Sequence, residues 1–481
     1  MDDTAARAAA CYGARMPRLR RLGFAAVALA VVACASGRGP IEPVLRVWDL
    51  GTTDIEVVGS WRAQLVSGSG TDLTRKAFCR SDGACVYLGL TQDSFAPGTH
   101  FLAMGEVPDQ RYQWARIYGG SAADELDGGA VAGDGFLLFG SSASPFTGVA
   151  TPIAARPLLV RIDGVGAPLW ARTLDGGGIE RLHDATSAGG DLVVVGYAGL
   201  GGTTPSVAVV RVGPDGALRW AQAYDLGEPG YAVAAAPGPD GGAVVAGYLR
   251  QPNVGFAGTP FLMGLDAAGR PVWARRYELE GPAQPRALVT LADGSLALVG
   301  SLFGARPGRS PFVLRIGPDH AVRLGRELRG LEAIEAFAVA DGGDGKVVVV
   351  GRRRDPFRER FWGFAMVVDD RGRITAHATL RSLGQVEFSA VATGRTGEYR
   401  VAGFTDSLGA AGFDMLVATW LPAQTVGRDV LVASRIAERD LVAKPVDVTA
   451  RAQPLAVRAT EVPPGALESR PLTVPTAATL K

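Results

Sequence analysis

The chain has 481 residues, and its 49 basic and 48 acidic side chains leave a formal net charge of +1. This balance argues against an extended basic surface, so we expect no nucleic-acid partner. The 65 glycines, 30 prolines and 47% hydrophobic residues are typical of a folded, turn-rich protein and argue against a disordered one.

Residues 1–34 have the pattern of a lipoprotein signal peptide. A basic stretch after Met16 precedes a short apolar run, residues 22–33, and then Cys34. The run is too short to cross a bilayer core of about 30 Å as a helix. The segment Val31–Cys34 resembles the lipobox of bacterial lipoproteins, which implies lipidation of Cys34, a lipid anchor in the membrane, and a place in the outer membrane or at the cell surface. Two alternatives stay open: cleavage elsewhere with an incidental Cys34, and a translation start at Met1 or at Met16.

Residues 35–54 are predicted to be a tether, and a repeat begins after them. One marker is a tryptophan followed by small and basic residues, with an apolar residue four positions on, as in Trp114–Tyr118 and Trp273–Tyr277. A second marker is an apolar run that ends in glycine, and it occurs at Gly89, Gly140, Gly196, Gly247, Gly300, Gly351 and Gly403. Two markers with the same period of 50–56 residues, together with short β segments, predict a β-propeller.

Each repeat has the pattern of four short strands. In the best copy these are residues 231–236, 243–248, 261–266 and 271–277, with glycine in the tight connections. Counting strands predicts an all-β, seven-bladed propeller over residues 55–421. The last blade lacks its outer strand, so we expect the N-terminal strand, residues 55–65 around Trp61, to pair beside residues 413–420 and close the ring.

The repeat resembles those of bacterial secreted β-propeller-repeat lipoproteins, with units of the form W-A-R-x-Y-G-G and D-G-G-x-V-V-x-G. Trp114 to Gly120 and Asp240 to Gly247 are the best copies. The resemblance implies a fold and an address, and no particular reaction.

The last segment, residues 422–481, is rich in Pro, Ala and Val and has no aromatic residue after Trp420. Such a segment buries little apolar area, so we expect a disordered or extended tail. An ordered appendage is the alternative, because residues 446–462 partly alternate.

Candidate catalytic groups are few. The histidines are expected in a third strand, a face loop, an opposite-face turn and an outer strand, for His100, His183, His320 and His377 in turn, so they should not converge on a metal. No zinc, nucleophile-elbow, phosphate-loop or calcium-loop motif is found, and no cofactor is expected. Cys79 and Cys85 flank a predicted hairpin turn, and a disulfide or two free thiols are both compatible with that spacing.

One face of the ring is the candidate partner-binding face. It would hold the loops into the first strands and those between second and third strands, where length and charge vary most. Exposed guanidinium and aromatic side chains would contact the partner. These are Arg352, Arg353, Arg354, Arg358, Phe146, Phe256 and Phe357. A solvated loop and Phe side chains folded between blades are the alternatives.

We expect a monomeric, non-catalytic binding or scaffolding protein of the cell envelope with an unknown protein or glycan partner. A quinoprotein-like or other propeller enzyme is one alternative, disfavoured by innermost strands that look rich in Ala and Val. A structural surface or adhesion lipoprotein without a small ligand is the other.

Overall fold

The computed structural model describes residues 46–49, 56–58, 61–67, 70–80, 82–92, 98–108, 111–144, 155–200, 204–250, 257–303, 308–330, 332–354, 359–381, 384–395, 397–406, 412–422, 437–440, 444–454, 457–461, 468–472 and 478–479. By its contacts the chain divides into residues 1–42 and 43–481, and every described residue belongs to the second unit. The predicted signal peptide with Cys34 therefore lies outside the described residues.

The described residues form β-sheets that are antiparallel apart from one short parallel pairing near the C-terminus, with no α-helix among them, and Pro239–Gly241 form one 3-10 turn. The all-β prediction is confirmed. Successive strands pair as four-stranded antiparallel groups. The first three groups are β4 (Asp72–Cys79), β5 (Cys85–Gln92), β6 (Thr99–Glu106) and β7 (Tyr112–Gly119); β8 (Asp124–Ala132), β9 (Gly135–Ser142), β10 (Arg156–Ile162) and β11 (Pro168–Gly176); and β12 (Ile179–Ala188), β13 (Asp191–Leu200), β14 (Thr204–Val212) and β15 (Leu218–Asp225).

Three further groups follow the same order along the chain. They are β16 (Gly230–Pro237), β17 (Ala243–Arg250), β18 (Gly258–Leu265) and β19 (Pro271–Glu278); β20 (Ala283–Thr290), β21 (Leu296–Phe303), β22 (Arg309–Ile316) and β23 (Val322–Arg329); and β24 (Ile334–Gly343), β25 (Lys346–Arg354), β26 (Phe361–Val368) and β27 (Ile374–Arg381). The fourth and fifth groups are connected by a single residue pair, Gly258 and Ala283.

The seventh group combines the two ends of the repeat region. β28 (Val386–Thr393), β29 (Tyr399–Thr405) and β30 (Asp414–Trp420) pair in sequence, and β3 (Trp61–Ser67) adds to β30 with Trp61 opposite Trp420. The expected pairing of the N-terminal strand is thus present. Its bounds differ, because β2 (Glu56–Val58) pairs instead with β27 of the sixth group. β1 (Arg46–Asp49) pairs with β3, so part of the predicted tether is a strand of the seventh group.

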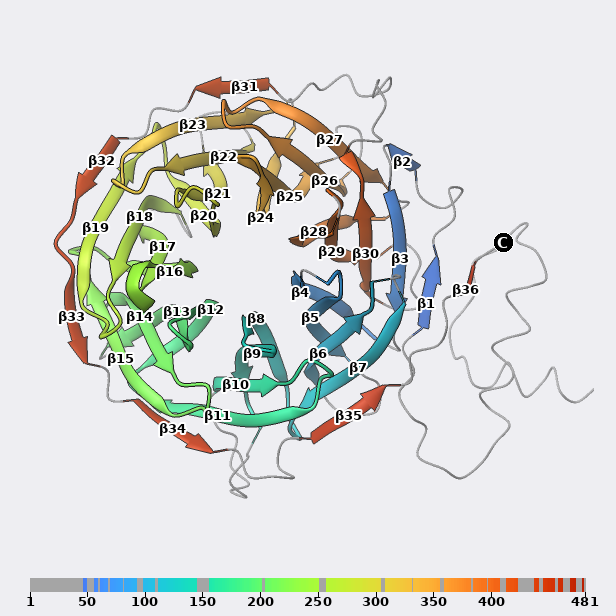
Figure 1. Ribbon diagram of the computed structural model, residues 1–481, viewed down its shortest axis with the longest axis horizontal. Coiled ribbons are helices and arrows are strands. Elements are labelled where there is room, and N and C mark those ends of the chain that lie inside the picture. Colours follow the sequence, from blue (N-terminus) through green and yellow to red (C-terminus); the bar gives the residue numbers. More distant parts are fainter. Residues whose placement is uncertain are drawn as a thin grey trace, which may run out of the picture. The chain divides into compact units, whose positions relative to one another are not determined.

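The groups surround a common axis, with the first strand of each innermost (Figure 1). Among the described residues, each of seven buried hydrophobic clusters joins two neighbouring groups. One of them packs Met415 and Val66 of the seventh group against Tyr87 and Met104 of the first. Because apolar burial is the main stabilising contribution to folding, the ring is held together by contacts that continue across its seam.

Both sequence markers have a structural explanation. At each marker glycine a Cβ atom would lie 1.8–2.1 Å from a carbonyl oxygen of the first strand, for example that of Tyr231 at Gly247. The marker tryptophans contact the next group: Trp220 donates from Nε1 to the carbonyl of Ala267 at 3.1 Å, in the turn between β18 and β19. Tyr224 donates to the carbonyl of Gly269 in the same turn at 2.7 Å. The repeats that keep the marker tryptophan or tyrosine therefore carry their own docking groups for the next group.

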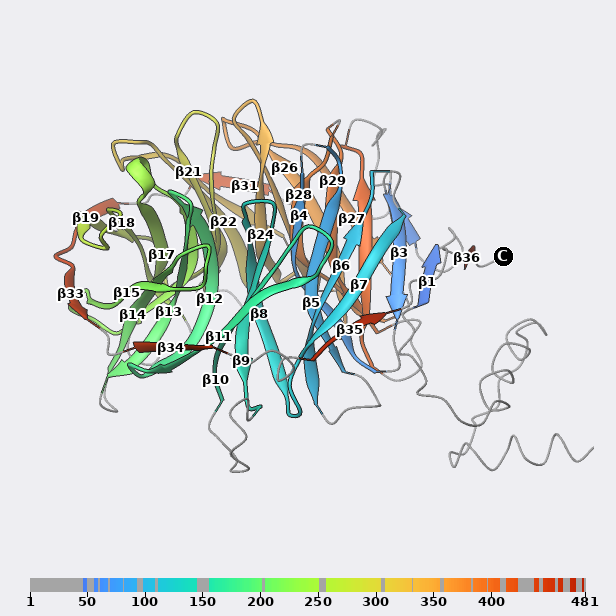
Figure 2. The same ribbon diagram turned by 60° about the horizontal axis from the view of Figure 1, so that its bottom comes forward.

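The described parts of the predicted tail are extended strands that lie along the outside of the ring (Figures 1 and 2). They run around it against the order of the groups. β31 (Ala437–Asp440) pairs with β23, β32 (Lys444–Asp447) with β19, β33 (Arg451–Pro454) with β15, β34 (Val457–Glu461) with β11 and β35 (Glu468–Leu472) with β7, all antiparallel, while β36 (Ala478–Thr479) pairs in parallel with β1.

Side-chain contacts add to this outer belt. Asp447 accepts a hydrogen bond of 2.8 Å from Nε of Arg275, and Val448 and Ala450 pack against the cluster between the third and fourth groups. With β2 on β27 and β1 on β3, the outer strand of each group described above has a partner. A strand edge left open is a template for aggregation, and the belt covers those edges.

Candidate binding site

Each innermost strand carries a β-bulge near its start. One residue of the first strand has no partner in the ladder with the second strand, and a bulge re-aims the side chain of that extra residue. The extra residues are Arg75, Asp127, His183, Val233, Arg286, Phe337 and Ser389. They lie toward the end of the ring at which the innermost strands begin, which we call the entry face. It is the face that the sequence analysis favoured for a partner.

Bulge side chains of different groups share the space around the axis. Burial raises the pKa of Asp127 to about 6, while Arg181 and, more weakly, Arg75 lower it. Burial, Arg181 and Arg286 together lower the pKa of His183 to about 4. Side chains of the first, second, third and fifth groups thus influence one another, which requires that they point toward the same axis.

Most charges near the axis are paired. We call Arg75, Glu125, Asp127, Arg181, Arg286, Glu335, Arg352 and Glu387 the axial cluster. The pairs are Arg181 with Asp127 (2.9 Å) and Glu125 (3.0 Å), Arg352 with Glu335 (2.8 Å) and Glu387 (2.7 Å), and Arg309 with Glu335. Although burial alone would raise it, the pKa of Glu335 is lowered by Arg352 and Arg309. The cluster therefore holds charges of both signs in fixed positions.

An arc of aromatic rings lines one side of the axial cluster. The ring of His183 stacks on Tyr197 with centroids 5.8 Å apart, Tyr197 meets Tyr231 edge to face at 4.9 Å, and Tyr231 stacks on Tyr248 at 5.1 Å. These four residues, which we call the aromatic arc, come from the third and fourth groups. Tyr231 and Tyr248 are buried, whereas His183 and Tyr197 are half-buried and can be reached by a ligand. The ring and hydroxyl of Tyr197 suit a ligand that is apolar on one side and polar at its edges.

Arginine and phenylalanine side chains alternate on the other side. The guanidinium of Arg286 lies 5.5 Å from the ring centre of Phe337, and that of Arg352 lies 5.4 Å from Phe337 and 4.2 Å from Phe361. Cation–π contacts of this length hold both partners in place. The series leads from the axis to a pocket of about 630 Å³ between the fifth and sixth groups. The pocket is lined by Phe303, Gly308, Arg309, Ala333, Glu335, Arg354, Glu359 and Phe361.

The arginines proposed for the partner-binding face have different roles. Arg352 is held by Glu335 and Glu387. The side chain of Arg353 is 1% exposed and is bound to Glu332. The expectation that Arg353 contacts a partner is therefore wrong, because its guanidinium is buried. Arg354 is 54% exposed and lines the pocket, 3.7 Å from Glu359. The other proposed residues, Arg358, Phe146, Phe256 and Phe357, lie outside the described residues.

The histidines are spread over the ring, and no cluster of His, Cys, Asp and Glu among the described residues could hold a metal ion. His100, His320 and His377 lie in the expected third strand, turn and outer strand. His183 was expected in a face loop, but it lies at the bulge of β12.

The side chains at the bulges are more often charged than the sequence analysis expected for innermost strands, which it described as rich in Ala and Val. Aligning the repeats on the marker glycine would have found them, since each bulge lies 13 or 14 positions before it.

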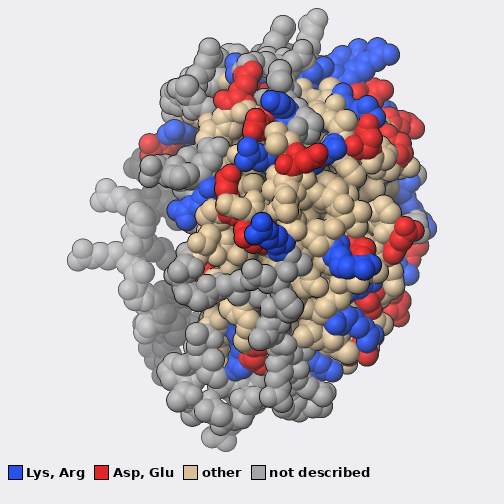
Figure 3. Space-filling view, turned by 90° about the vertical axis from the view of Figure 1, so that its left-hand side faces the viewer, with Lys and Arg blue, Asp and Glu red and all other residues tan. Residues whose placement is uncertain are grey.

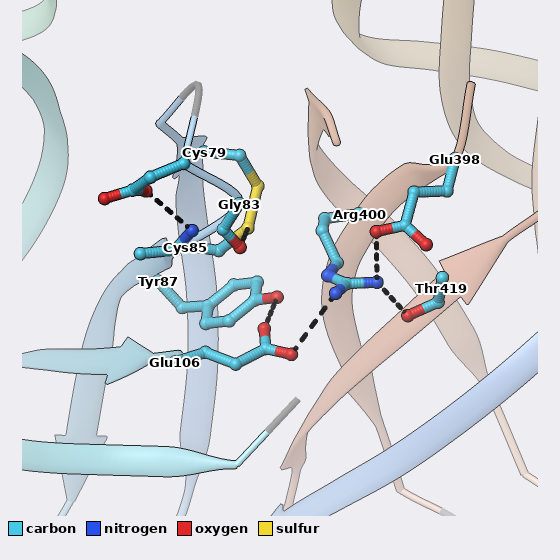
Figure 4. Close-up of a disulfide and its surroundings, with 10 residues drawn as sticks. Cys79, Gly83, Cys85, Tyr87, Glu106, Glu398, Arg400 and Thr419 are labelled. Carbon is cyan, nitrogen blue, oxygen red and sulfur yellow. Dashed lines mark hydrogen bonds and ion pairs between the residues drawn. A yellow bond between two sulfur atoms is a disulfide. The ribbon is translucent and has the colours of Figure 1, made fainter. Parts of the chain in front are cut away.

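Cys79 and Cys85 are joined by a disulfide at the end of the ring opposite the entry face, across the β4–β5 hairpin (Figure 4). Nearby, the hydroxyl of Tyr87 donates to Glu106, which also lies 3.5 Å from Arg400 of the seventh group. The disulfide closes a small loop next to the ring seam. It is distant from the axial cluster, so its role is structural.

The outer side of the ring around β19 and β32 shows basic and acidic side chains interspersed, with uncharged areas between them (Figure 3). This view gives no extended field of one sign. Within the described ranges, no helix has the length and apolar character needed to span a membrane.

Comparison with known proteins leaves the family open. No family model matches the sequence, and no curated protein matches it. Solved structures that resemble the chain include Sqt1 from Chaetomium thermophilum, at 14% identity and a TM-score of 0.35 over 68% of this chain and 73% of that chain. Another is Trypanosoma rangeli sialidase in complex with sialic acid, at 9% identity and a TM-score of 0.35 over 80% of this chain and 57% of that chain. At this level of similarity neither protein indicates the function of this chain.

Proposed function

We propose that this chain is a lipid-anchored, seven-bladed β-propeller of the bacterial cell envelope that binds a partner at its entry face without chemical turnover. The ring of four-stranded groups, joined to their neighbours by buried hydrophobic clusters, supports the propeller. The axial cluster carries the binding role, because polar side chains from several groups meet there at solvent-accessible positions such as Arg286 and Glu125. Convergent polar groups beside aromatic rings are typical of ligand sites.

The anchor part of the proposal rests on Cys34 and the apolar run before it. Cys34→Ser should move the protein from the membrane fraction to the soluble fraction and abolish metabolic palmitate labelling. Labelling that persists in Cys34→Ser would show that the anchor lies elsewhere, without affecting the assignment of the binding face.

The binding part is tested by capture from the cell envelope. The exported chain is cross-linked in its own envelope as wild type, as Tyr197→Ala with Arg286→Gln at the entry face, and as Asp215→Ala with Asp293→Ala on the opposite face. We expect the entry-face variant to lose its cross-linked partner and the opposite-face variant to keep it. The reverse pattern would overturn the choice of face, and a pattern unchanged in both variants would favour a purely structural lipoprotein.

An enzyme is the second candidate, and one observation favours it. The carboxyl of Asp127 lies beside Arg181 near the axis with a pKa raised to about 6 by burial, a value that suits general acid–base catalysis near neutral pH. Product formation from a bound ligand, lost in Asp127→Asn while binding remains, would replace the binding proposal by an enzymatic one.

A further inference from the structure

We propose that the axial cluster binds a carboxylate-bearing saccharide, with the guanidinium of Arg286 receiving the carboxylate and the half-buried ring of Tyr197 in the aromatic arc supporting the sugar ring. This inference rests on the proposed binding function and names its ligand class. It is argued from the guanidinium of Arg286, which lies near the aromatic arc and has no ion pair with a carboxylate among the described residues, and from the acceptors around it.

Arg286 differs from the other arginines on its side of the axis. Arg309 and Arg352 each bind Glu335, and Arg352 also binds Glu387. Among the described residues, Arg286 has no hydrogen bond or ion pair, and its guanidinium lies over the ring of Phe337. Its side chain is exposed. A guanidinium in this state presents a planar pair of donors, which fits a carboxylate in a bidentate manner.

The surroundings of Arg286 limit the charge of the ligand. Glu335, Glu387 and Tyr248 are near enough to act on the pKa of Arg286. That pKa is lowered mainly because protein atoms crowd the guanidinium, although the side chain remains accessible to solvent. Two carboxylates beside the receiving cation would repel a dianion such as a phosphate more strongly than a single carboxylate. Since Arg352 and Arg309 already neutralise much of the charge of Glu335, a monoanion meets a small net positive charge.

The remaining groups of the site favour a ligand that has hydroxyl donors and a flat apolar surface. Tyr197 lies close enough to Glu180 and Asp127 for both carboxylates to act on its pKa, which is raised mainly by burial. Ionised carboxylates only accept hydrogen bonds, so a ligand there must supply donors. Sugar hydroxyls supply them, and the C–H face of a sugar ring packs on tyrosine rings. An acidic peptide would instead place further carboxylates beside Glu125, Glu180 and Glu387.

The test measures binding of two probes to the exported Cys34→Ser chain by isothermal titration calorimetry. The probes are trisaccharides with two neutral hexoses and a single acidic residue at the non-reducing end, galacturonate in one trimer and mannuronate in the other. The methyl esters of both trimers, which lack the charge, are the matched ligands. We expect at least one acid trimer to bind and its ester to bind about 10- to 100-fold more weakly, the range of a lost hydrogen bond to a charged group. Arg286→Gln should cause a similar loss for the acid trimer, and Arg286→Lys a smaller one.

The control variant is Arg270→Gln, whose side chain is 79% exposed on the opposite end of the ring and pairs with Asp266. It should bind like wild type. Tyr197→Ala should weaken the acid and the ester alike, because it removes the supporting ring and not the cation. Thermal midpoints that match wild type would show that each variant is folded.

Four outcomes would overturn the ligand class. These are no binding of either trimer, equal binding of acid and ester, unchanged binding in Arg286→Gln, and tighter Arg286-dependent binding of tetraglutamate than of both trimers. The last outcome would assign an acidic peptide. If the trimers fail while envelope cross-linking still depends on the entry face, the ligand class is wrong and the proposed function stands. If both fail, the function fails too.

Discussion

Arg400 of β29 lies 3.5 Å from Glu106 of β6, across the seam where the last group of strands meets the first. Their side chains are 1% and 3% exposed, and Arg400 also lies 3.4 Å from Glu398. Figure 4 shows the pair beside Tyr87 and the disulfide. The seam of the ring is therefore closed by strand pairing, by apolar packing and by a buried ion pair.

Removing one partner of this pair should strongly destabilise the ring. Arg400→Met removes the Arg400 guanidinium from the buried carboxylate of Glu106, and breaking a buried ion pair from one side typically costs about 3–5 kcal/mol of unfolding free energy. Arg219→Met is the matched control, because its side chain is 44% exposed and its pairs with Asp191 and Asp215 are at the surface. The control should cost less than about 1 kcal/mol in guanidinium denaturation. Equal losses in both variants would mean that the seam pair adds nothing.

Truncation after residue 435 should expose the outer edges of five groups. The belt strands β31–β35 cover β23, β19, β15, β11 and β7, so backbone amides of these outer strands should exchange faster in the truncated chain. β27 is an internal control, since β2 still covers it. Hydrogen exchange read by mass spectrometry measures this, and unchanged protection of residues 275–278 would contradict the belt.

Deleting residues 61–67 should be worse than the truncation. β3 lies between β30 and β1 and buries Ala63, Leu65 and Val66, whereas the belt adds strands at the surface. We expect a lower thermal midpoint for this deletion than for the truncated chain. A higher one would show that the belt, and not the N-terminal strand, closes the ring.

Replacing the disulfide should have a modest effect. Cys79 and Cys85 are separated by 6 positions, and a loop this short accounts for about 2 kcal/mol of stabilisation in the chain-entropy description. Cys79→Ser with Cys85→Ser should lose about that much, and reductant should raise the intact mass of the exported Cys34→Ser chain by about 2 Da. An unchanged mass would show that the thiols are free.

The pKa of His183 should report on Arg286. The unfolded chain binds this proton near pH 6.5 and the folded chain near 4, so the unfolded state holds more protons between these values. The contribution of His183 to stability is therefore complete above pH 6.5 and is lost as the pH falls toward 4. Arg286→Gln removes a neighbouring cation and should raise the folded pKa, measured by NMR titration of the imidazole. Arg270→Gln should leave the pKa of His183 unchanged. If the pKa of His183 were the same in wild type and in both variants, Arg286 would not lie close enough to His183 to affect it.

The strands and turns of each repeat could be predicted from the sequence, because the residues that determine them lie within the repeat itself. Alternating apolar residues and turn glycines specify strands, and a residue such as Trp220 specifies how one group docks on the next. The partner of the Trp61 strand also followed, since the last repeat lacks an outer strand and an open edge is unfavourable.

The position of the tail and the composition of the axial cluster were decided by the tertiary structure. Residues 437–472 contain no aromatic residue. The strands described among them, β31 to β35, pair with β23, β19, β15, β11 and β7 through backbone hydrogen bonds, which any residue except proline can donate. In the same way, Arg352 and Arg353 are adjacent and alike in sequence, yet Arg353 is buried and Arg352 faces the axial cluster. Successive side chains of a strand point to opposite faces, and only the packed ring determines which face is covered.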